Sequence, residues 1–132
     1  MILQHERPED FVLATGVTTR IKDFMIKAFE QVGVELEFKG KETEEIALVK
    51  SHNGAYAFKT GQEVMAIDPR YFRPTEVDLL KGDASKAFKL LGWKPRYTWQ
   101  MLCEEMVASD VKLFQKEAVL KDAGFEIKNQ YE

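Results

Sequence analysis

The sequence predicts a small mixed fold of helices and strands, in the α/β or α+β class, formed by one domain over residues 1–132. Three observations support this prediction. The chain of 132 residues has the length of one typical domain, and its hydrophobic fraction of 45% is enough to form a core. Apolar residues recur at helical spacing in several stretches. Short continuous or alternating apolar runs lie between those stretches, as strands of the same domain would.

The first third contains a predicted buried strand and a predicted helix. Residues 11–16 form a short apolar run that closes with a glycine, which is typical of a buried strand. Thr18 or Thr19 can then cap a helix that ends at Gly33. The core face of this helix is predicted to consist of Ile21, Phe24, Met25, Ala28, Phe29 and Val32.

The middle third is predicted to form short strands. The polar residues 39–45 indicate a loop, and Asn53-Gly54 indicates a hairpin turn. Strands are expected at 34–38, 46–49, 55–58 and 63–67, with 55–58 as the returning arm of the hairpin.

The last third is predicted to be mainly helical. Asp83 can cap a helix that runs to about Leu91, and Gly92 then stops it. Thr98 opens a long final helix that ends before Gly124. The inward face of this final helix is predicted to contain Leu102, Met106, Val107, Val111 and Phe114.

Composition and charge argue against several classes of function. The chain has 19 Lys and Arg residues against 22 Asp and Glu residues, a formal net charge of −3, so we expect no binding to nucleic acid or to an anionic membrane. No apolar run approaches the ~20 residues that span a bilayer, and the first residues lack a signal-peptide pattern. Cys103 is the single cysteine, which fits a reducing, cytoplasmic location.

The sequence offers no clear metal site or nucleophile. His5 and His52 are the only histidines, and neither has a partner at the spacing that zinc ligands require. Cys103 lies among apolar residues in a helical pattern, so we interpret it as core filling. We therefore predict no metal ion and no catalytic residue in this chain.

Residues 68–78 differ from the rest because aromatic, arginine and acidic residues stand among two prolines. Pro74 suits the first turn of a short helix that contains Glu76, which would place Arg73 and Glu76 on nearby faces. An arginine fork binds two phosphate oxygens, and a carboxylate accepts hydrogen bonds from both hydroxyls of a cis-diol. The pair would therefore suit a nucleoside diphosphate. On spacing alone, a simple surface salt bridge is the favoured alternative.

The identity of the surrounding residues favours the nucleoside diphosphate site over the surface salt bridge. The run Asp68-Pro-Arg-Tyr-Phe-Arg-Pro-Thr-Glu-Val-Asp78, with Gly82-Asp83 and Leu91-Gly-Trp-Lys-Pro95 after it, resembles the C-terminal part of the GDP-mannose 4,6-dehydratases. These enzymes are extended short-chain dehydrogenase/reductases. The opening residues 8–16 and the helical residues 105–110 are also similar to that family. The resemblance covers about residues 8–124 and leaves 125–132 as a tail.

The resemblance implies a fold and a role. The chain would be the small substrate-binding domain of an extended short-chain dehydrogenase/reductase, without the Rossmann domain. Arg73 would contact the diphosphate and Glu76 the ribose of GDP or GDP-mannose, with weak affinity in the isolated chain. Arg70 and Tyr71 lie in the same loop without an assigned contact, and Tyr71 could equally be a packing aromatic.

The chain departs from the family pattern by omission. It has no glycine-rich turn for NADP after a strand, although the full-length family uses that cofactor. It also has no Tyr-x-x-x-Lys pair: the residues four places after Tyr56, Tyr71 and Tyr97 are Thr60, Thr75 and Met101, and the fourth tyrosine is followed by a single residue. The acid–base tyrosine needs that lysine to lower its pKa. We therefore expect no cofactor in this chain and no lyase activity from the chain alone.

Three interpretations stay open at this point. The chain is a fragment of a longer dehydratase, or a free-standing nucleotide-sugar module that works with a separate Rossmann chain. Alternatively, it is a structural or protein-interaction module derived from such a gene, with a vestigial nucleotide-sugar site. The first two interpretations imply a missing neighbour, whose absence would expose apolar surface. We therefore expect either self-association or a partner chain.

Overall fold

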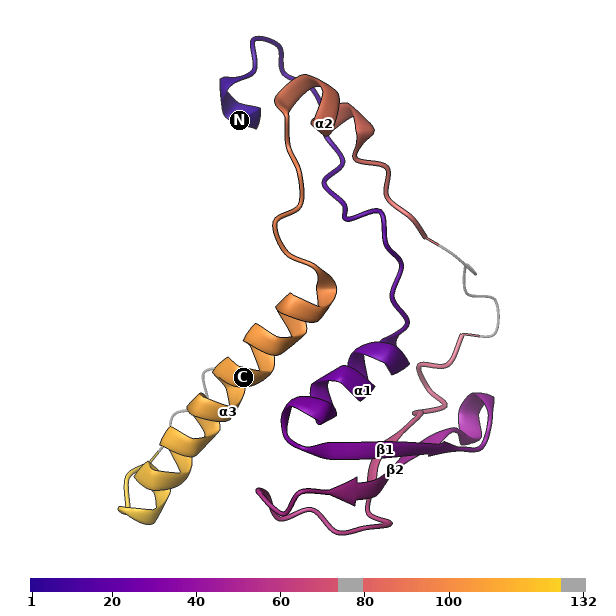
Figure 1. The fold of residues 1–132 in the computed structure, drawn as a ribbon, viewed down its shortest axis with the longest axis vertical. Helices are drawn as coiled ribbons and strands as arrows, with labels where there is room; N and C mark the ends of the chain where they lie inside the picture. Colours follow the sequence, from indigo (N-terminus) through magenta and orange to yellow (C-terminus); the bar gives the residue numbers. More distant parts are fainter. Residues whose placement is uncertain (74–79, 127–132) are drawn as a thin grey trace.

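The computed structural model describes residues 1–73 and 80–126, and it has an α+β fold (Figure 1). Of the two predicted classes, α+β is the one observed. The main elements in chain order are α1 (Ile21–Gln31), β1 (Val34–Lys39), β2 (Ile46–His52), β3 (Glu63–Ala66), α2 (Ser85–Leu91) and α3 (Trp99–Asp122). Single turns of 3-10 helix occur at Ile2–Gln4 and Glu42–Glu44.

The three strands form one antiparallel sheet in the order β1-β2-β3. Phe38 pairs with Ala47 across β1 and β2, and Ala47 pairs with Met65 across β2 and β3. The prediction of a strand at 55–58 is wrong, because the returning arm of the hairpin is β3. The backbone bends at residues 54–57, and Phe58 packs against Phe29 of α1 with ring centroids 6.0 Å apart. Packing of this aromatic residue onto the helix therefore replaces strand pairing.

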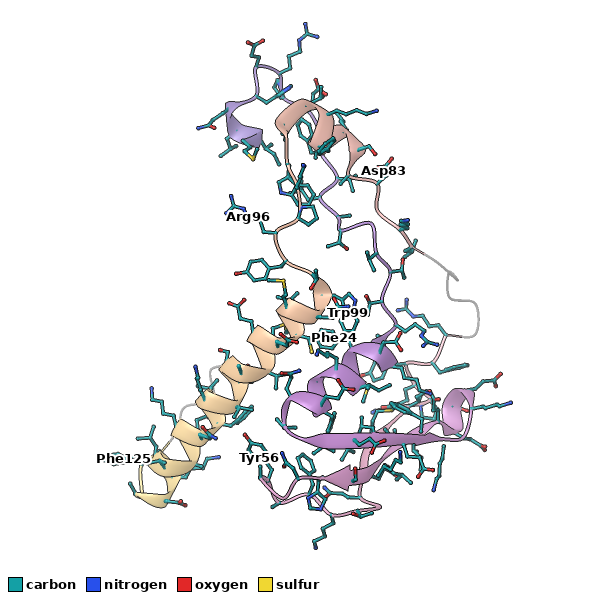
Figure 2. The ribbon with its side chains drawn as sticks, in the orientation of Figure 1. Phe24, Tyr56, Asp83, Arg96, Trp99 and Phe125 are labelled. Carbon is teal, nitrogen blue, oxygen red and sulfur yellow. The ribbon has the colours of Figure 1, made fainter. Side chains whose placement is uncertain are left out.

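Helix α1 lies between the sheet and α3, and the main core forms there (Figure 1). Val34 and Val49 of the sheet are almost fully buried, and so is Cys103 of α3. The rings of Phe24 and Trp99 meet at the start of the α1–α3 contact, with centroids 6.4 Å apart (Figure 2). Lys27 and Glu104 add an ion pair of 3.0 Å. The interpretation of Cys103 as core filling is confirmed.

The ends of α1 agree only partly with the prediction. Neither Thr18 nor Thr19 caps the helix, because Arg20 occupies the N-cap position without a side-chain capping bond. Arg20 instead donates from its guanidinium to Asp23 in the first turn, at 2.8 and 2.9 Å. Gly33 ends the helix region as predicted, with φ of +72°, and its carbonyl accepts a hydrogen bond from the backbone of Asn53 at 2.9 Å.

The predicted strand at 11–16 is wrong. Among the described residues, no strand pairs with this segment, which runs without regular structure between the N-terminus and α1 (Figure 1). It lies beside the segment that leads into α2, since Thr18 donates to the carbonyl of Leu80 at 3.2 Å. A Cβ atom on Gly82 would lie only 2.6 Å from Cβ of Ala14. The two segments touch without forming a ladder.

The C-terminal helices have the predicted stops, and α3 has the predicted cap, but the prediction that Asp83 caps α2 is wrong. Asp83 accepts a hydrogen bond from the backbone N–H of Ser85 at 2.9 Å, although Ala84 is the N-cap residue of α2. Gly92 stops α2 in the left-handed conformation with φ of +66°. Thr98 caps α3 by accepting a hydrogen bond from the N–H of Met101 at 3.2 Å.

The predicted inward face of α3 is only half correct. Val107 and Val111 are half-buried, whereas Leu102, Met106 and Phe114 are exposed. The side of α3 that contacts α1 is centred on Trp99 and Cys103, which lie one helical turn apart. The described residues leave the neighbouring side of the helix, which contains Leu102 and Met106, uncovered.

Candidate functional site

The candidate site is the loop that follows β3. The chain turns immediately after the strand, because the N–H of Tyr71 donates to the carbonyl of Asp68 at 3.0 Å. Pro69 stands at the second position of this turn, where its fixed φ is favourable. The sequence Asp-Pro-Arg-Tyr therefore builds a defined turn that ends two residues before Arg73.

An ion pair inside the turn joins Asp68 to Arg70. The Nε atom of Arg70 lies 3.1 and 3.0 Å from the two carboxylate oxygens of Asp68, and Nη2 lies 2.6 Å from Oδ2. The backbone N–H of Arg70 also donates to Oδ1 at 2.9 Å. The side-chain hydrogen bonds from Arg70 lower the pKa of Asp68 below its ordinary value, and the same contacts raise the pKa of Arg70.

The two residues predicted to bind GDP have different outcomes. Arg73 is exposed, and among the described residues its side chain makes neither an ion pair nor a hydrogen bond. Glu76, together with the short helix predicted to begin at Pro74, lies outside the described residues. Tyr71 is 78% exposed, so it does not pack in the core of the described structure, and the guanidinium of Arg70 lies 5.7 Å from the centre of its ring.

A hollow of about 520 Å³ lies elsewhere, and the sequence did not predict it. Three separate segments form its wall, which contains Thr15, Lys81, Ser85, Trp93 and Lys94 among others. The Gly82-Asp83 and Trp93-Lys94-Pro95 motifs were visible in the sequence, but their proximity depends on tertiary structure. Arg73 is not part of this wall.

The described residues do not fit a dinucleotide cofactor. Dinucleotides bind where a parallel sheet reverses its strand order, beside the glycine-rich start of a helix. The described sheet is antiparallel and joined by hairpin-type connections, so it has no such position. Within residues 1–73 and 80–126, no three His, Cys, Asp or Glu side chains gather in a way that could hold a metal ion.

The same described ranges also contain no helix with the combined length and apolar character needed to cross a membrane.

Comparison with known proteins identifies the family. The family model for GDP-mannose 4,6 dehydratase matches residues 1–106. The chain belongs to the GDP-mannose 4,6-dehydratase family. Individual dehydratases are similar over almost the whole chain: one from Vibrio cholerae is 47% identical, and one from Yersinia enterocolitica is 43% identical, each over 129 residues. A human GDP-mannose 4,6 dehydratase is 39% identical over 115 residues.

The chain spans about a third of the length of these dehydratases. The two bacterial alignments cover 96% of this chain but 35% of each relative, and the human alignment covers 87% and 29%. The resemblance inferred from the Asp-Pro-Arg-Tyr-Phe-Arg-Pro segment is thus confirmed at the level of the family. It does not by itself assign a role to Arg73 or Glu76.

Proposed function

We propose that this chain supplies the GDP-binding part of a GDP-mannose 4,6-dehydratase. In this proposal residues 1–132 act as one small substrate-binding domain of the extended short-chain dehydrogenase/reductase type. Arg73 binds the diphosphate and Glu76 binds the ribose of GDP-mannose. The observation that supports it best is the exposed Arg73 side chain, two residues after a structured turn, in a chain that belongs to this family.

The proposed role is binding without independent catalysis. Dehydration of a sugar nucleotide through a keto intermediate requires a hydride carrier and an acid–base group near the sugar. The chain contains no Tyr-x-x-x-Lys pair, and the described sheet does not fit NADP. The catalytic steps would therefore require a Rossmann domain, on the same polypeptide or on a separate chain. Incubation of the pure chain with GDP-mannose and NADP should give no 4-keto-6-deoxy product.

Calorimetry with GDP and GDP-mannose tests the binding proposal. We expect weak heat of binding at about 1 mM ligand, because only one part of the pocket is present. Arg73→Ala and Glu76→Ala should each weaken or abolish this heat. Arg96→Ala is the matched control, since Arg96 is an exposed arginine on the connector between α2 and α3 (Figure 2). Absence of heat with the wild-type chain, or equal loss in the control, would contradict the proposal.

A second candidate function is a structural or interaction module with a vestigial sugar-nucleotide site. The exposed apolar side chains favour this alternative. Val12, Leu13 and Leu80 are all more than half exposed on the segments between the N-terminus, α1 and α2. Surface of this kind commonly contacts another protein.

We therefore propose that this surface is covered, either by a Rossmann domain or by a second copy of the chain. Analytical ultracentrifugation should show mass that increases with protein concentration, and the double variant Val12→Ser/Leu13→Ser should reduce it. The matched control is Lys112→Ser, which changes an exposed polar side chain of α3. A monomer at all concentrations would contradict self-association. Recovery of dehydratase activity after mixing with a Rossmann-only chain would support a Rossmann domain as the partner that covers this surface.

A further inference from the structure

The turn after β2 exposes an asparagine that is followed by a glycine. Asn53 and Gly54 come directly after the strand, and both are exposed. The backbone nitrogen that follows an asparagine can attack the carbonyl carbon of its side chain, because the two groups belong to one chain and close a five-membered succinimide ring. A side chain on the following residue would hinder this attack. At Gly54 even a Cβ would meet no atom within 4 Å, so the space around the nitrogen is open.

His52 places a base at the attacking nitrogen. Its Nδ1 atom accepts a hydrogen bond from the backbone N–H of Gly54 at 3.2 Å. The lone pair of Nδ1 therefore already faces the proton that Gly54 must lose before its nitrogen can attack. The backbone of His52 is itself held in the sheet, where it pairs with Val34. The end of the strand thus keeps the imidazole beside the turn.

Ala55 places a hydrogen-bond donor at the carbonyl under attack. Its backbone N–H donates to Oδ1 of Asn53 at 2.9 Å. A donor at this position stabilises the negative charge that develops on Oδ1 when the Cγ carbon becomes tetrahedral. A base, a nucleophile and a donor for the oxyanion therefore surround one side-chain amide.

We propose that Asn53 is a self-modification site at which His52 acts as the base. The nitrogen of Gly54 passes its proton to Nδ1 of His52 and forms a bond to Cγ of Asn53. The tetrahedral carbon then breaks its bond to Nδ2, which takes the proton from His52 and leaves as ammonia. Water opens the succinimide at either of its carbonyl groups and yields aspartate or isoaspartate at position 53. Neither step requires an oxidant or a reductant.

The modification would alter the contact between the end of β2 and the end of α1. The backbone N–H of Asn53 donates to the carbonyl of Gly33 at 2.9 Å, and a Cβ on Gly33 would fall 1.9 Å from Nδ2 of Asn53. The neutral amide of Asn53 therefore lies tightly against Gly33. Both products place a carboxylate at position 53, and isoaspartate also lengthens the backbone there. The product should consequently unfold at a lower temperature than the unmodified chain.

Mass spectrometry of the folded chain during incubation near neutral pH tests the proposal. Replacement of the amide by a carboxyl group raises the mass by about 1 Da, and fragmentation locates the change. Hydroxylamine cleaves a succinimide, so its addition should release fragments 1–53 and 54–132. Asn129 precedes a glutamine and serves as the internal reference, which should change far more slowly.

Substitution of the base separates its chemistry from its hydrogen bond. His52→Gln keeps a hydrogen-bond acceptor but removes the base, and it should slow the change at position 53 at least about fivefold. Free imidazole added to this variant should restore part of the rate. His5→Gln is the matched control, since His5 is the other histidine and contacts the carbonyl of Arg7, and it should leave the rate unchanged. Circular dichroism verifies that both variants are folded.

Urea provides a second test, because unfolding separates the base and the oxyanion donor from the amide. The unfolded chain should therefore change at position 53 more slowly than the folded chain. An equal or higher rate in urea would overturn the proposal, since the fold would then protect the amide. A wild-type rate in folded His52→Gln would overturn the assignment of the base. None of these outcomes depends on whether the chain binds GDP.

Discussion

Two regions of the molecule differ in how their backbone is held. The first, here called the body, comprises α1, the three-stranded sheet and α3. The second, here called the connector pair, comprises residues 8–20 and 80–98 and includes α2 (Figure 1). The body contains the strand ladders and, of the five buried hydrophobic residues within 1–73 and 80–126, it contains four, whereas the fifth, Ala87, lies in the connector pair. The body therefore contains the contacts that hold a fold together, and the connector pair depends on a few contacts between side chains.

The contacts within the connector pair are mostly polar and exposed. Lys86 of α2 pairs with Glu9 at 2.8 Å and donates to the carbonyl of Asp10 at 2.9 Å. Its ammonium group also lies 4.9 Å from the centre of the Phe11 ring. Such contacts contribute little to stability in water. The comparison teaches that residues 8–20 and 80–98 hold apolar side chains, such as Val12, Leu13 and Leu80, that the described residues leave exposed.

Hydrogen exchange should show the largest difference between the two regions. We expect backbone amides of β2, such as that of Val49, to exchange about a hundredfold or more slowly than amides of residues 11–16, because only β2 is paired on both sides. Mass spectrometry after short exchange times provides the measurement. Similar protection in both segments would show that residues 11–16 pair in solution, and the contrast between the regions would be lost.

A matched pair of valine substitutions should give the next largest effect. Val49→Ala removes fully buried methyl groups and should lower the free energy of unfolding by about 2 kcal/mol. Val12→Ala removes exposed ones and should change it by less than about 0.5 kcal/mol. Urea denaturation followed by circular dichroism measures both. Equal losses would mean that the connector pair unfolds together with the body.

A matched pair of glycine substitutions sharpens the same comparison. Gly33 and Gly16 both have φ of +72°, but Gly33 lies in the body, where a Cβ would fall 1.9 Å from the side chain of Asn53. Gly33→Ala should therefore lower the free energy of unfolding by about 1–2 kcal/mol. Gly16→Ala should leave the main unfolding transition almost unchanged, since its strain falls on a segment that is not part of the cooperative unit. A lower Tm for Gly16→Ala than for Gly33→Ala would reverse this assignment.

The smallest expected effect is a pH dependence of two ion pairs, one in each region. The pKa of Glu35 lies below its ordinary value of 4.5 because Lys50 and Ser51 donate hydrogen bonds to its carboxylate, and Lys86 lowers the pKa of Glu9 in the same way. A lowered pKa in the folded state stabilises the fold above about pH 4.5, and this contribution disappears as the pH falls through the lowered pKa.

Titration by nuclear magnetic resonance measures both carboxyl groups. Lys50→Met should return the pKa of Glu35 to its ordinary value, and Lys86→Met should do the same for Glu9. A pKa of Glu9 that is already ordinary in the wild-type chain would show that α2 does not stay against residues 8–11 in solution.

Local signals in the sequence predicted most of the body. The glycine stops at Gly33 and Gly92 and the threonine cap at Thr98 are present. These features depend on neighbours in the sequence, so a single chain reveals them. The predicted core face of α1 is half-buried, apart from Ile21, which is exposed because it begins the helix beyond the contact with α3 and the sheet. All three strands of the sheet were also predicted, β3 among them. Only the additional strand at 55–58 is wrong, because tertiary packing of Phe58 on α1 decides its conformation.

The remaining features depend on contacts between distant segments. An apolar run such as residues 11–16 predicts a strand only if a partner strand exists, and none lies beside it among the described residues. The hollow near Trp93 and the exposed side of α3 likewise depend on how distant segments of the chain pack against one another. For the candidate site, the resemblance identified the loop, but the contact between Asp68 and Arg70 emerged only from the coordinates. The roles of Arg73 and Glu76 in binding stay predictions.

The burial of Cys103 has a practical consequence for the experiments above. Its thiol is enclosed between α1 and α3, and burial raises its pKa, so little reactive thiolate forms near neutral pH. It is also the single cysteine of the chain. A fluorophore or spin label attached through a cysteine introduced on the surface would therefore report from one chosen position, with no need to remove the native sulfhydryl.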